Sequence, residues 1–271
     1  MPQDASAPPF AAVQTHSVCV VLPAFNAATT LETTLDRLPP GSYQHLILVD
    51  DCSTDNTVEV ATSLSQRGYR LQVIRHSENR GYGGNQKTCY RAALETDADI
   101  VVMLHPDNQY DPVLVPHLVG FIEAGVVDVV LGSRILRRVD VLRGGMPPLK
   151  YFANRLLTIV ENVILGFNLP EYHTGYRAYH RRVLERIDFD ACSDDFVFDQ
   201  QLLVQARAHD LRVGAVPVPT HYGPESSSIS LRRSSVYALG TLVVLFRYVL
   251  FRAGFRRQRL FRAGAETPRD P

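Results

Sequence analysis

The chain has 271 residues, of which 45% are apolar, and its 28 basic residues are balanced by 28 acidic ones. This composition supports one sizeable buried core, so it excludes a chain that is disordered throughout. The core segments carry no basic stripe, which argues against nucleic acid as a partner.

The charges are unevenly distributed along the chain. Residues 1–120 carry 7 basic and 13 acidic side chains, whereas residues 232–271 carry 9 arginines against Glu266 and Asp270. A net charge of about +7 on this tail predicts an anionic partner, most simply an acidic membrane surface or a phosphate-bearing molecule.

The four cysteines lie far apart, with no histidine at ligand spacing, so neither a zinc site nor a disulfide framework is indicated. The first residues lack a positive and apolar leader, so we expect no secretory signal, a disordered lead over residues 1–15, and a cytoplasmic location.

Apolar, β-branched runs alternate with segments of helical spacing, a pattern typical of an α/β protein with a mostly parallel sheet. The predicted strands are residues 17–22, 45–49, 71–74, 100–104, 128–131, 173–179 and 213–218. The predicted helices are residues 29–38, 56–66, 85–95, 112–124, 149–165, 196–208 and 235–252. We therefore predict one α/β domain over residues 16–230, an amphipathic basic helix over 231–262, and a tail over 263–271.

The strand over residues 100–104 ends in a polar cluster that contains His105, Asp107 and Gln109. Ligands of open α/β sheets bind beyond the carboxyl ends of the strands, so Asp107 and Gln109 should project into a site. Their oxygens suit a hard divalent cation that carries phosphates. Asp111 is instead explained as the cap of the helix that begins at Pro112.

Two further clusters follow strands. Asp50, Asp51 and Asp55 come after the strand over 45–49, and capping of the next helix explains only one of them. Gly81-Tyr82-Gly83-Gly84 resembles a phosphate-cradling loop at a helix N-terminus. It lacks the spacing of a dinucleotide fingerprint and the Lys-Ser/Thr of a P-loop, which excludes both of those families.

The C-terminal apolar run over residues 235–252 is interrupted by Arg247 and is shorter than the roughly 20 residues that a bilayer core requires. It should lie on a membrane or on a partner rather than cross. A basic loop precedes the apolar helix over 149–165 and is either a solvated turn or an entry site for a lipid phosphate. Its basic residues are Arg137, Arg138, Arg143 and Lys150.

Taken together and in order, these motifs make residues 18–228 resemble glycosyltransferase family 2, which has a GT-A fold, and within it the polyprenyl-phosphate sugar synthases. The segments that carry the resemblance are Pro23-Ala24-Phe25-Asn26, Asp50-Asp51-Cys52-Ser53-Thr54-Asp55, Asn79-Arg80-Gly81, His105-Pro106-Asp107-Asn108-Gln109, Gly132-Ser133-Arg134, Thr174-Gly175-Tyr176-Arg177 and 196–203.

The resemblance implies a role for several residues. Pro23 and Phe25 would frame the nucleotide base of a GDP-mannose or UDP-glucose type of donor, and Asp50 or Asp51 would accept hydrogen bonds from base or ribose. Asp107 and Gln109 would hold Mg²⁺ or Mn²⁺. Further residues of the donor site would be Gly81, Arg134, which would help bind phosphate, Arg177 and His221.

The implied reaction is an inverting sugar transfer, with a polyprenyl phosphate as the expected acceptor and the cytoplasmic face of a membrane as the expected location. Asp199 would serve as the catalytic base if the acceptor were instead a sugar or protein hydroxyl. A homo-oligomer remains possible.

Four positions depart from the family pattern. His105 replaces the first aspartate of the D-x-D motif, Ala27 replaces an acidic residue, and His221 and Ser227 replace two cations. His105 could still bind Mn²⁺, but imidazole suits Mg²⁺ poorly. Arg232 or Arg233 could replace a missing cation. These departures leave open a catalytically weak subunit that only binds nucleotide sugars.

Overall fold

The computed structural model describes residues 16–135, 148–219, 231–255 and 259–261. In this part of the chain a seven-stranded sheet has the order β3-β2-β1-β4-β6-β5-β7. Only β6 runs antiparallel to its neighbours, β4 and β5. The strands are β1 Val18–Ala24, β2 His45–Asp50, β3 Leu71–Arg75, β4 Ile100–Met103, β5 Val129–Ser133, β6 Arg177–His180 and β7 Val213–Pro217. The predicted mostly parallel α/β fold is thereby confirmed.

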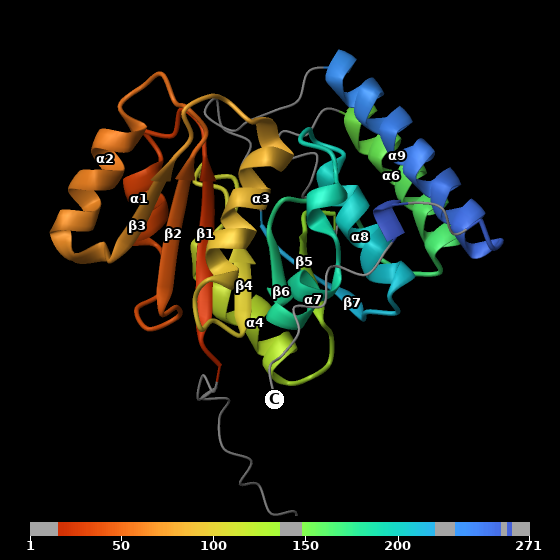
Figure 1. The fold of residues 1–271 in the computed structure, drawn as a ribbon, viewed down its shortest axis with the longest axis horizontal. Helices are drawn as coiled ribbons and strands as arrows, with labels where there is room; N and C mark the ends of the chain where they lie inside the picture. The colour runs from red at the N-terminus through yellow and green to blue at the C-terminus, as the bar shows by residue number, and fades with distance from the viewer. Residues whose placement is uncertain (1–15, 136–147, 220–230, 256–258, 262–271) are drawn as a thin grey trace, which may run out of the picture.

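Helices cover both faces of the sheet (Figure 1). The α-helices are α1 Leu31–Asp36, α2 Thr57–Leu64, α3 Gly81–Leu94, α4 Val115–Glu123, α6 Pro148–Leu165, α7 Arg181–Arg186, α8 Phe198–Ala208 and α9 Leu231–Arg252. Short turns of other helix types are η1 Ser65–Tyr69, η2 Pro112–Leu114, η3 Phe189–Ala191 and η4 Arg259–Phe261.

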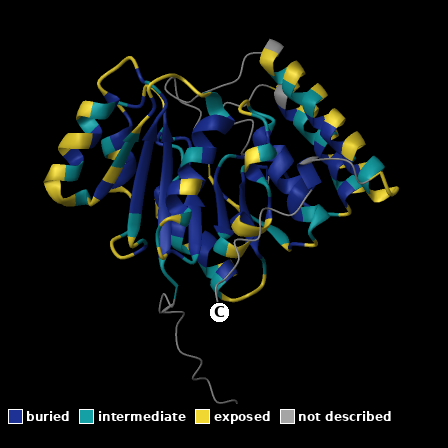
Figure 2. Ribbon diagram, viewed as in Figure 1, coloured by how far each residue is buried: buried dark blue, intermediate teal, exposed yellow. Residues whose placement is uncertain are grey.

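Strand β1 shows why the apolar runs are continuous rather than alternating. All seven of its residues are buried. Cys19 and Val21 belong to a core cluster shared with α3, α7 and α8, whereas Val20 and Leu22 belong to the cluster shared with α1, α2 and α4. A strand covered on both faces is apolar at nearly every position. The sheet is accordingly buried between its helices, as the dark blue strands in Figure 2 show.

Two of the boundaries that differ from the prediction affect the site. Helix α3 begins at Gly81 rather than at residue 85, so the glycine-rich segment forms its first turn. Strand β6 begins at Arg177 rather than at residue 173, so Thr174 and Gly175 lie in the preceding loop. That loop ends near the carboxyl end of β4, because β4 and β6 are antiparallel.

Helix α9 spans Leu231–Arg252, so it starts before the predicted apolar helix over 235–252 and at the start of the predicted basic segment over 231–262. It lies beside α6 at one end of the molecule (Figure 1) and also contacts α8. Among the described residues it is the one helix long and apolar enough, by length and composition, to cross a membrane over Arg233–Arg252. Yet Val244, Leu245 and Tyr248 are buried in the core cluster of α3 and α8. One side of α9 is therefore an integral part of the domain.

Candidate active site

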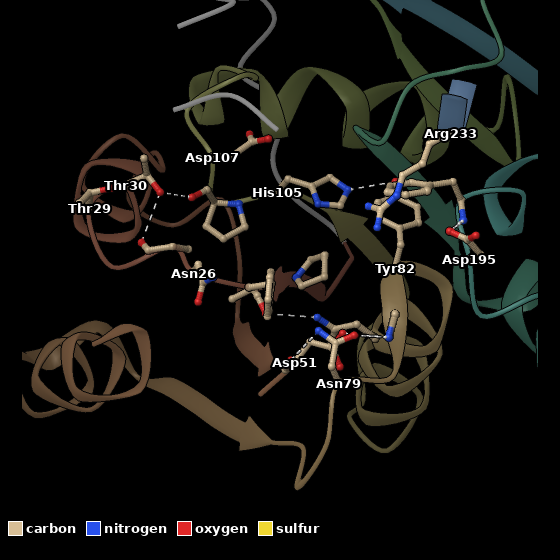
Figure 3. Close-up of a pocket in the computed structure, with 18 residues that line it drawn as sticks. Asn26, Thr29, Thr30, Asp51, Asn79, Tyr82, His105, Asp107, Asp195 and Arg233 are labelled. Atoms are coloured by element: carbon tan, nitrogen blue, oxygen red, sulfur yellow. Dashed lines mark hydrogen bonds between the residues drawn. The ribbon is translucent and has the colours of Figure 1, made fainter. Parts of the chain in front are cut away.

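A cavity of about 660 Å³ opens where the carboxyl ends of β1, β2 and β4 meet. Its walls come from six segments, namely residues 23–30, Asp51, the start of α3 with Asn79, residues 105–107, residues 195–196 and Arg233 of α9. Figure 3 shows these side chains converging from elements that are distant in sequence. This is the edge of the sheet at which the sequence placed a ligand site.

Hydrogen bonds between loops hold the cavity walls together. The backbone N–H of Asn26 donates to Ser53 Oγ at 2.9 Å, and that of Ala27 donates to Thr57 Oγ1 at 2.8 Å. The Thr30 hydroxyl donates to the carbonyl oxygen of Pro106. Asn26 has a left-handed backbone, with a φ of 52°, as does Asn108 with 57°. Such conformations cost free energy and persist where the surrounding contacts determine them.

Asp51 organises the segment between β3 and α3. Its Oδ1 lies 2.8 Å from His76 Nδ1 and accepts the backbone N–H of Arg80 at 2.8 Å, while Oδ2 accepts that of Gly81 at 3.0 Å. Asp50 is fully buried, and its Oδ1 has no hydrogen-bond partner in the described residues. Asp50 is not among the residues that line the cavity.

The glycines after β3 do not form the open phosphate cradle that their sequence suggested. The backbone N–H groups of Gly83 and Gly84 both donate to the carbonyl oxygen of Asp194, at 2.8 and 3.3 Å. A Cβ atom on Gly83 would lie 2.4 Å from the carbonyl oxygen of Ser193. These glycines therefore allow α3 to approach the segment before α8. Gly81 does line the cavity.

His105 and Asp107 line the cavity two residues apart, directly after β4. Asp107 Oδ1 accepts the backbone N–H of Gln109 at 3.0 Å. The Gln109 side chain is buried and is not among the residues that line the cavity. No group of three or more histidine, cysteine or acidic side chains that could hold a metal occurs in the described residues. A carboxylate with an imidazole still fits Mn²⁺, and Asp107 fits Mg²⁺, because such ions take most of their other ligands from phosphates and water.

His105 packs against Tyr82, a residue whose role in the site could not be predicted from the sequence. The two rings are nearly parallel, at 11°, with centroids 5.5 Å apart. Burial lowers the pKa of His105, and the nearby Asp107 carboxylate opposes this shift. Burial thus favours the neutral imidazole, which is the form that binds metals.

The two arginines that the resemblance assigned to the donor site do not line the cavity. Arg134 Nε donates to Glu171 Oε1 at 3.0 Å, and its Nη2 donates to the carbonyl oxygen of His173. Arg177 is fully buried and donates to the carbonyl oxygens of Thr174, Tyr172 and Asp199. Both guanidinium groups thus hold loops in place around the site. His221 and the basic loop residues 137, 138 and 143 lie outside the described residues, and the side chain of Lys150 is likewise not described.

Asp199 sits behind the cavity wall. Its side chain is buried, its Oδ2 accepts the Tyr82 hydroxyl at 2.7 Å, and its Oδ1 accepts Gln86 Nε2 at 3.3 Å. It does not line the cavity. Asp194, in the segment before α8, pairs with Lys87 Nζ at 2.7 Å.

Arg233 brings a cation to the cavity from the first turns of α9 (Figure 3). The sequence suggested it only as a substitute for the cations missing at His221 and Ser227. Phe196 also lines the cavity and packs against Tyr82, with the two ring centroids 4.9 Å apart. Phe196 could not be selected from the sequence, because an aromatic residue in an acidic segment can equally line a cavity or pack in the core.

Comparisons with known proteins identify the family of the chain. The model of a family described as "Glycosyl transferase family 2" matches residues 19–188. The chain is 24% identical over 249 residues to the UDP-N-acetylglucosamine–dolichyl-phosphate N-acetylglucosaminyltransferase of Methanococcus voltae, covering 88% of this chain and 96% of the relative. It is 26% identical over 203 residues to the undecaprenyl-phosphate mannosyltransferase of Micrococcus luteus, covering 74% of this chain and 82% of the relative.

Among solved structures, glucosyl-3-phosphoglycerate synthase from Mycobacterium tuberculosis is similar, with a TM-score of 0.65 and 21% identity over 86% of this chain and 80% of that one. That structure contains Mn²⁺, uridine diphosphate and glucosyl-3-phosphoglycerate. At 21% identity, this structural similarity shows a shared fold.

Proposed function

The chain belongs to glycosyltransferase family 2 and is a glycosyltransferase of the GT-A fold, and on this basis we propose that it transfers a sugar, with inversion, from a nucleoside diphosphate to a polyprenyl phosphate at a membrane surface. The observation that supports the proposal is the cavity at the carboxyl ends of the strands, which lies beside α9. One end would suit a nucleotide, and the other end would suit a diphosphate.

The nucleotide end of the cavity lies between β1 and β2. Phe25 is 53% exposed and lines the cavity with Pro23, so the two offer an apolar surface to a base. Asp51 lines the same end, whereas the neighbouring Asp50 is fully buried and is not among the lining residues. Ring N–H or ribose hydroxyl groups of a GDP- or UDP-linked donor would donate hydrogen bonds to Asp51 at this end.

The diphosphate end lies at residues 105–107, opposite α3 and α9. Asp107, with His105 beside it, would hold Mg²⁺ or Mn²⁺ there. When bound, the metal would neutralise charge on the departing diphosphate. Arg233 would add a fixed positive charge at the same end, where charge develops in the transition state.

The reaction needs no strong base if the acceptor is a phosphate. A phosphate oxygen of the acceptor attacks the anomeric carbon, the bond from this carbon to the donor diphosphate breaks, and its electron pair leaves with the nucleoside diphosphate. The acceptor arrives already ionised, so no proton has to be removed. The position of Asp199 behind the wall supports this chemistry over attack by a hydroxyl group.

An apolar face formed by α6 and α9 would bring the cavity to the membrane. We call it the α6–α9 face; Figure 2 shows exposed residues along both helices. Its exposed apolar residues are Leu149, Phe152, Leu156, Ile159 and Val163 on α6, and Val236, Leu239, Leu242, Val243, Phe246 and Val249 on α9. Arg247 and Arg252 are exposed on the same helix as the second group. Apolar surface beside arginines suits an anionic bilayer interface.

We therefore expect α9 to lie in the membrane surface, with its buried side against α8. Leu156→Glu combined with Phe246→Glu should abolish co-sedimentation with anionic vesicles at low salt, because each charge opposes insertion of the face into lipid. Val126→Glu is the matched control, since Val126 is 57% exposed and lies after α4, outside the α6–α9 face. Equal sedimentation of the wild type and the double variant would show that the face binds a protein subunit or a second copy of the chain instead.

Arg233→Ala should weaken donor binding by about tenfold or more, because a charge-assisted contact to phosphate contributes roughly 1.5–3 kcal/mol. Titration calorimetry with nucleoside diphosphate and Mn²⁺ measures this change. Arg247→Ala is the control, since it removes the same charge from an exposed position of the same helix. Equal affinities of the two variants would remove Arg233 from the donor site.

A panel of GDP- and UDP-linked sugars in a thermal-shift assay, with Mn²⁺ or Mg²⁺, identifies the donor. Stabilisation by a nucleotide sugar without any turnover would favour a subunit that only binds donors. Transfer to a sugar or protein hydroxyl would favour the second candidate acceptor. The proposed site of action is the cytoplasmic face of the membrane, where nucleotide sugars are available.

A further inference from the structure

A row of polar side chains connects the interior of the domain to the cavity through Asp199, Tyr82 and His105. The Tyr82 hydroxyl donates to Asp199 Oδ2 at 2.7 Å and lies 3.4 Å from His105 Nε2. Asp199 is fixed from behind, because Gln86 donates to its Oδ1 and the fully buried Arg177 places Nη1 3.8 Å from the same atom.

The hydrogen atoms in this row have one consistent arrangement. A carboxylate only accepts hydrogen bonds, so the single hydroxyl hydrogen of Tyr82 points at Asp199. The oxygen of Tyr82 is then an acceptor toward His105, and Nε2 of the imidazole must carry the hydrogen. In a neutral imidazole the other nitrogen, Nδ1, then bears a lone pair. In the described part of the chain His105 Nδ1 makes no hydrogen bond.

Packing holds the imidazole in this orientation from two sides. The Tyr82 ring lies parallel to that of His105, with the centroids 5.5 Å apart, and is itself backed by Phe196. On another side the loop before β6 comes so close that a Cβ atom on Gly175 would lie 2.6 Å from His105 Nε2 and 3.1 Å from the Tyr82 oxygen. A larger residue at position 175 would therefore displace the imidazole or the Tyr82 ring from this contact.

We propose that Tyr82 is a positioning residue for His105: its hydroxyl, oriented by Asp199, holds the imidazole with its hydrogen on Nε2 and keeps Nδ1 as the acceptor toward the cation of the donor diphosphate. What Nδ1 binds rests on the proposed function; the hydrogen position does not. His105 occupies the place of an aspartate in the family motif, and a neutral imidazole suits Mn²⁺ better than Mg²⁺. Tyr82 thus sets the metal preference of the site, and Asp199 acts through Tyr82.

The hydrogen position is measured directly by nuclear magnetic resonance on protein labelled with ¹⁵N in its histidines, at pH 8 and without metal. His105→Gln identifies the two signals that belong to His105. The wild type should show a protonated Nε2 and an unprotonated Nδ1. Tyr82→Phe keeps the stacked ring but removes the hydroxyl, and it should shift His105 toward a mixture of the two tautomers.

Two further variants complete this experiment, one as a control and one as an independent perturbation of His105. Tyr172→Phe is the matched control, because it removes a hydroxyl that donates to Asn162 Oδ1 at 2.8 Å outside the cavity, and it should leave the His105 signals unchanged. Gly175→Ala should act like Tyr82→Phe, since the added methyl group displaces the imidazole from the other side.

The second readout is the binding of Mn²⁺ and of Mg²⁺ in the presence of nucleoside diphosphate. Tyr82→Phe should lower the affinity for Mn²⁺ by about 10–100-fold, the usual effect of losing a partner that orients a metal ligand. Its effect on Mg²⁺ should be smaller, so the preference for Mn²⁺ should fall.

A hydrogen on Nδ1 in the wild type, or identical His105 signals in the wild type and Tyr82→Phe, would overturn the inference. If the tautomer shifts as expected while no nucleotide sugar is ever turned over, the positioning role of Tyr82 stands and the proposed transferase reaction fails. The two proposals are thus tested separately.

Discussion

Asp107→Asn is expected to eliminate divalent-dependent donor binding and to lower kcat/KM by about 10²–10³-fold or more, the range seen when a group that stabilises transition-state charge is removed. Asp107 supplies the one carboxylate of residues 105–107 that line the cavity. Asparagine has the same shape but no charge, so it tests the electrostatic role. Calorimetric titration of nucleoside diphosphate with and without Mn²⁺ measures the loss.

Asp111→Asn is the matched control for this experiment. Asp111 lies four residues further on, where it accepts the backbone N–H of Val113 at 3.1 Å and pairs with Arg37. The change should leave donor binding intact, because asparagine also caps helices. His105→Ala should be milder than Asp107→Asn. Equal metal-dependent affinity in the wild type and Asp107→Asn would remove Asp107 from the metal site.

Glu171→Ala is expected to lower the free energy of unfolding by about 3–5 kcal/mol, because it leaves Arg134 as a buried charge without its carboxylate. Glu171 is fully buried, and it also accepts the backbone N–H of Arg134 at 2.9 Å and Asn154 Nδ2 at 3.1 Å. Urea denaturation followed by circular dichroism measures the change.

Glu185→Ala is the comparison for Glu171→Ala. Glu185 pairs with Arg181 across one turn of α7, and its side chain is 43% exposed, so the loss should stay below about 1 kcal/mol. If Glu171→Ala costs no more than Glu185→Ala, and if Arg134→Met weakens donor binding, then Arg134 binds phosphate as the family resemblance implied.

The strands could be predicted from the sequence because burial on both faces makes each strand an apolar run bounded by polar residues. The direction of β6 could not be predicted, since an apolar run reads the same in a parallel and in an antiparallel strand. The start of α3 at Gly81 could not be predicted from the sequence either. Glycines usually end helices, and only the close approach of residues 193–194 explains why they occupy the first turn.

Within the site, Asp51 and Asp107 could be selected because they follow strands whose carboxyl ends meet at one edge of the sheet. Arg134 and Arg177 show the limit of this reasoning. An arginine in a loop looks the same whether its partner is a ligand phosphate or a carboxylate 37 residues away, as Glu171 is from Arg134. Tyr82 was missed because the importance of its hydroxyl depends on Asp199, which is 117 residues away.

The most direct test of the proposed function is sugar transfer itself. The purified protein is incubated with Mn²⁺, with the labelled nucleotide sugar selected from the donor panel, and with anionic vesicles containing either a polyprenyl phosphate or the matching polyprenol. We predict labelled lipid only with the phosphate, an anomeric configuration opposite to that of the donor, and no product with Asp107→Asn. Labelling of polyprenol or of a sugar or protein hydroxyl, without labelling of polyprenyl phosphate, would contradict the proposal.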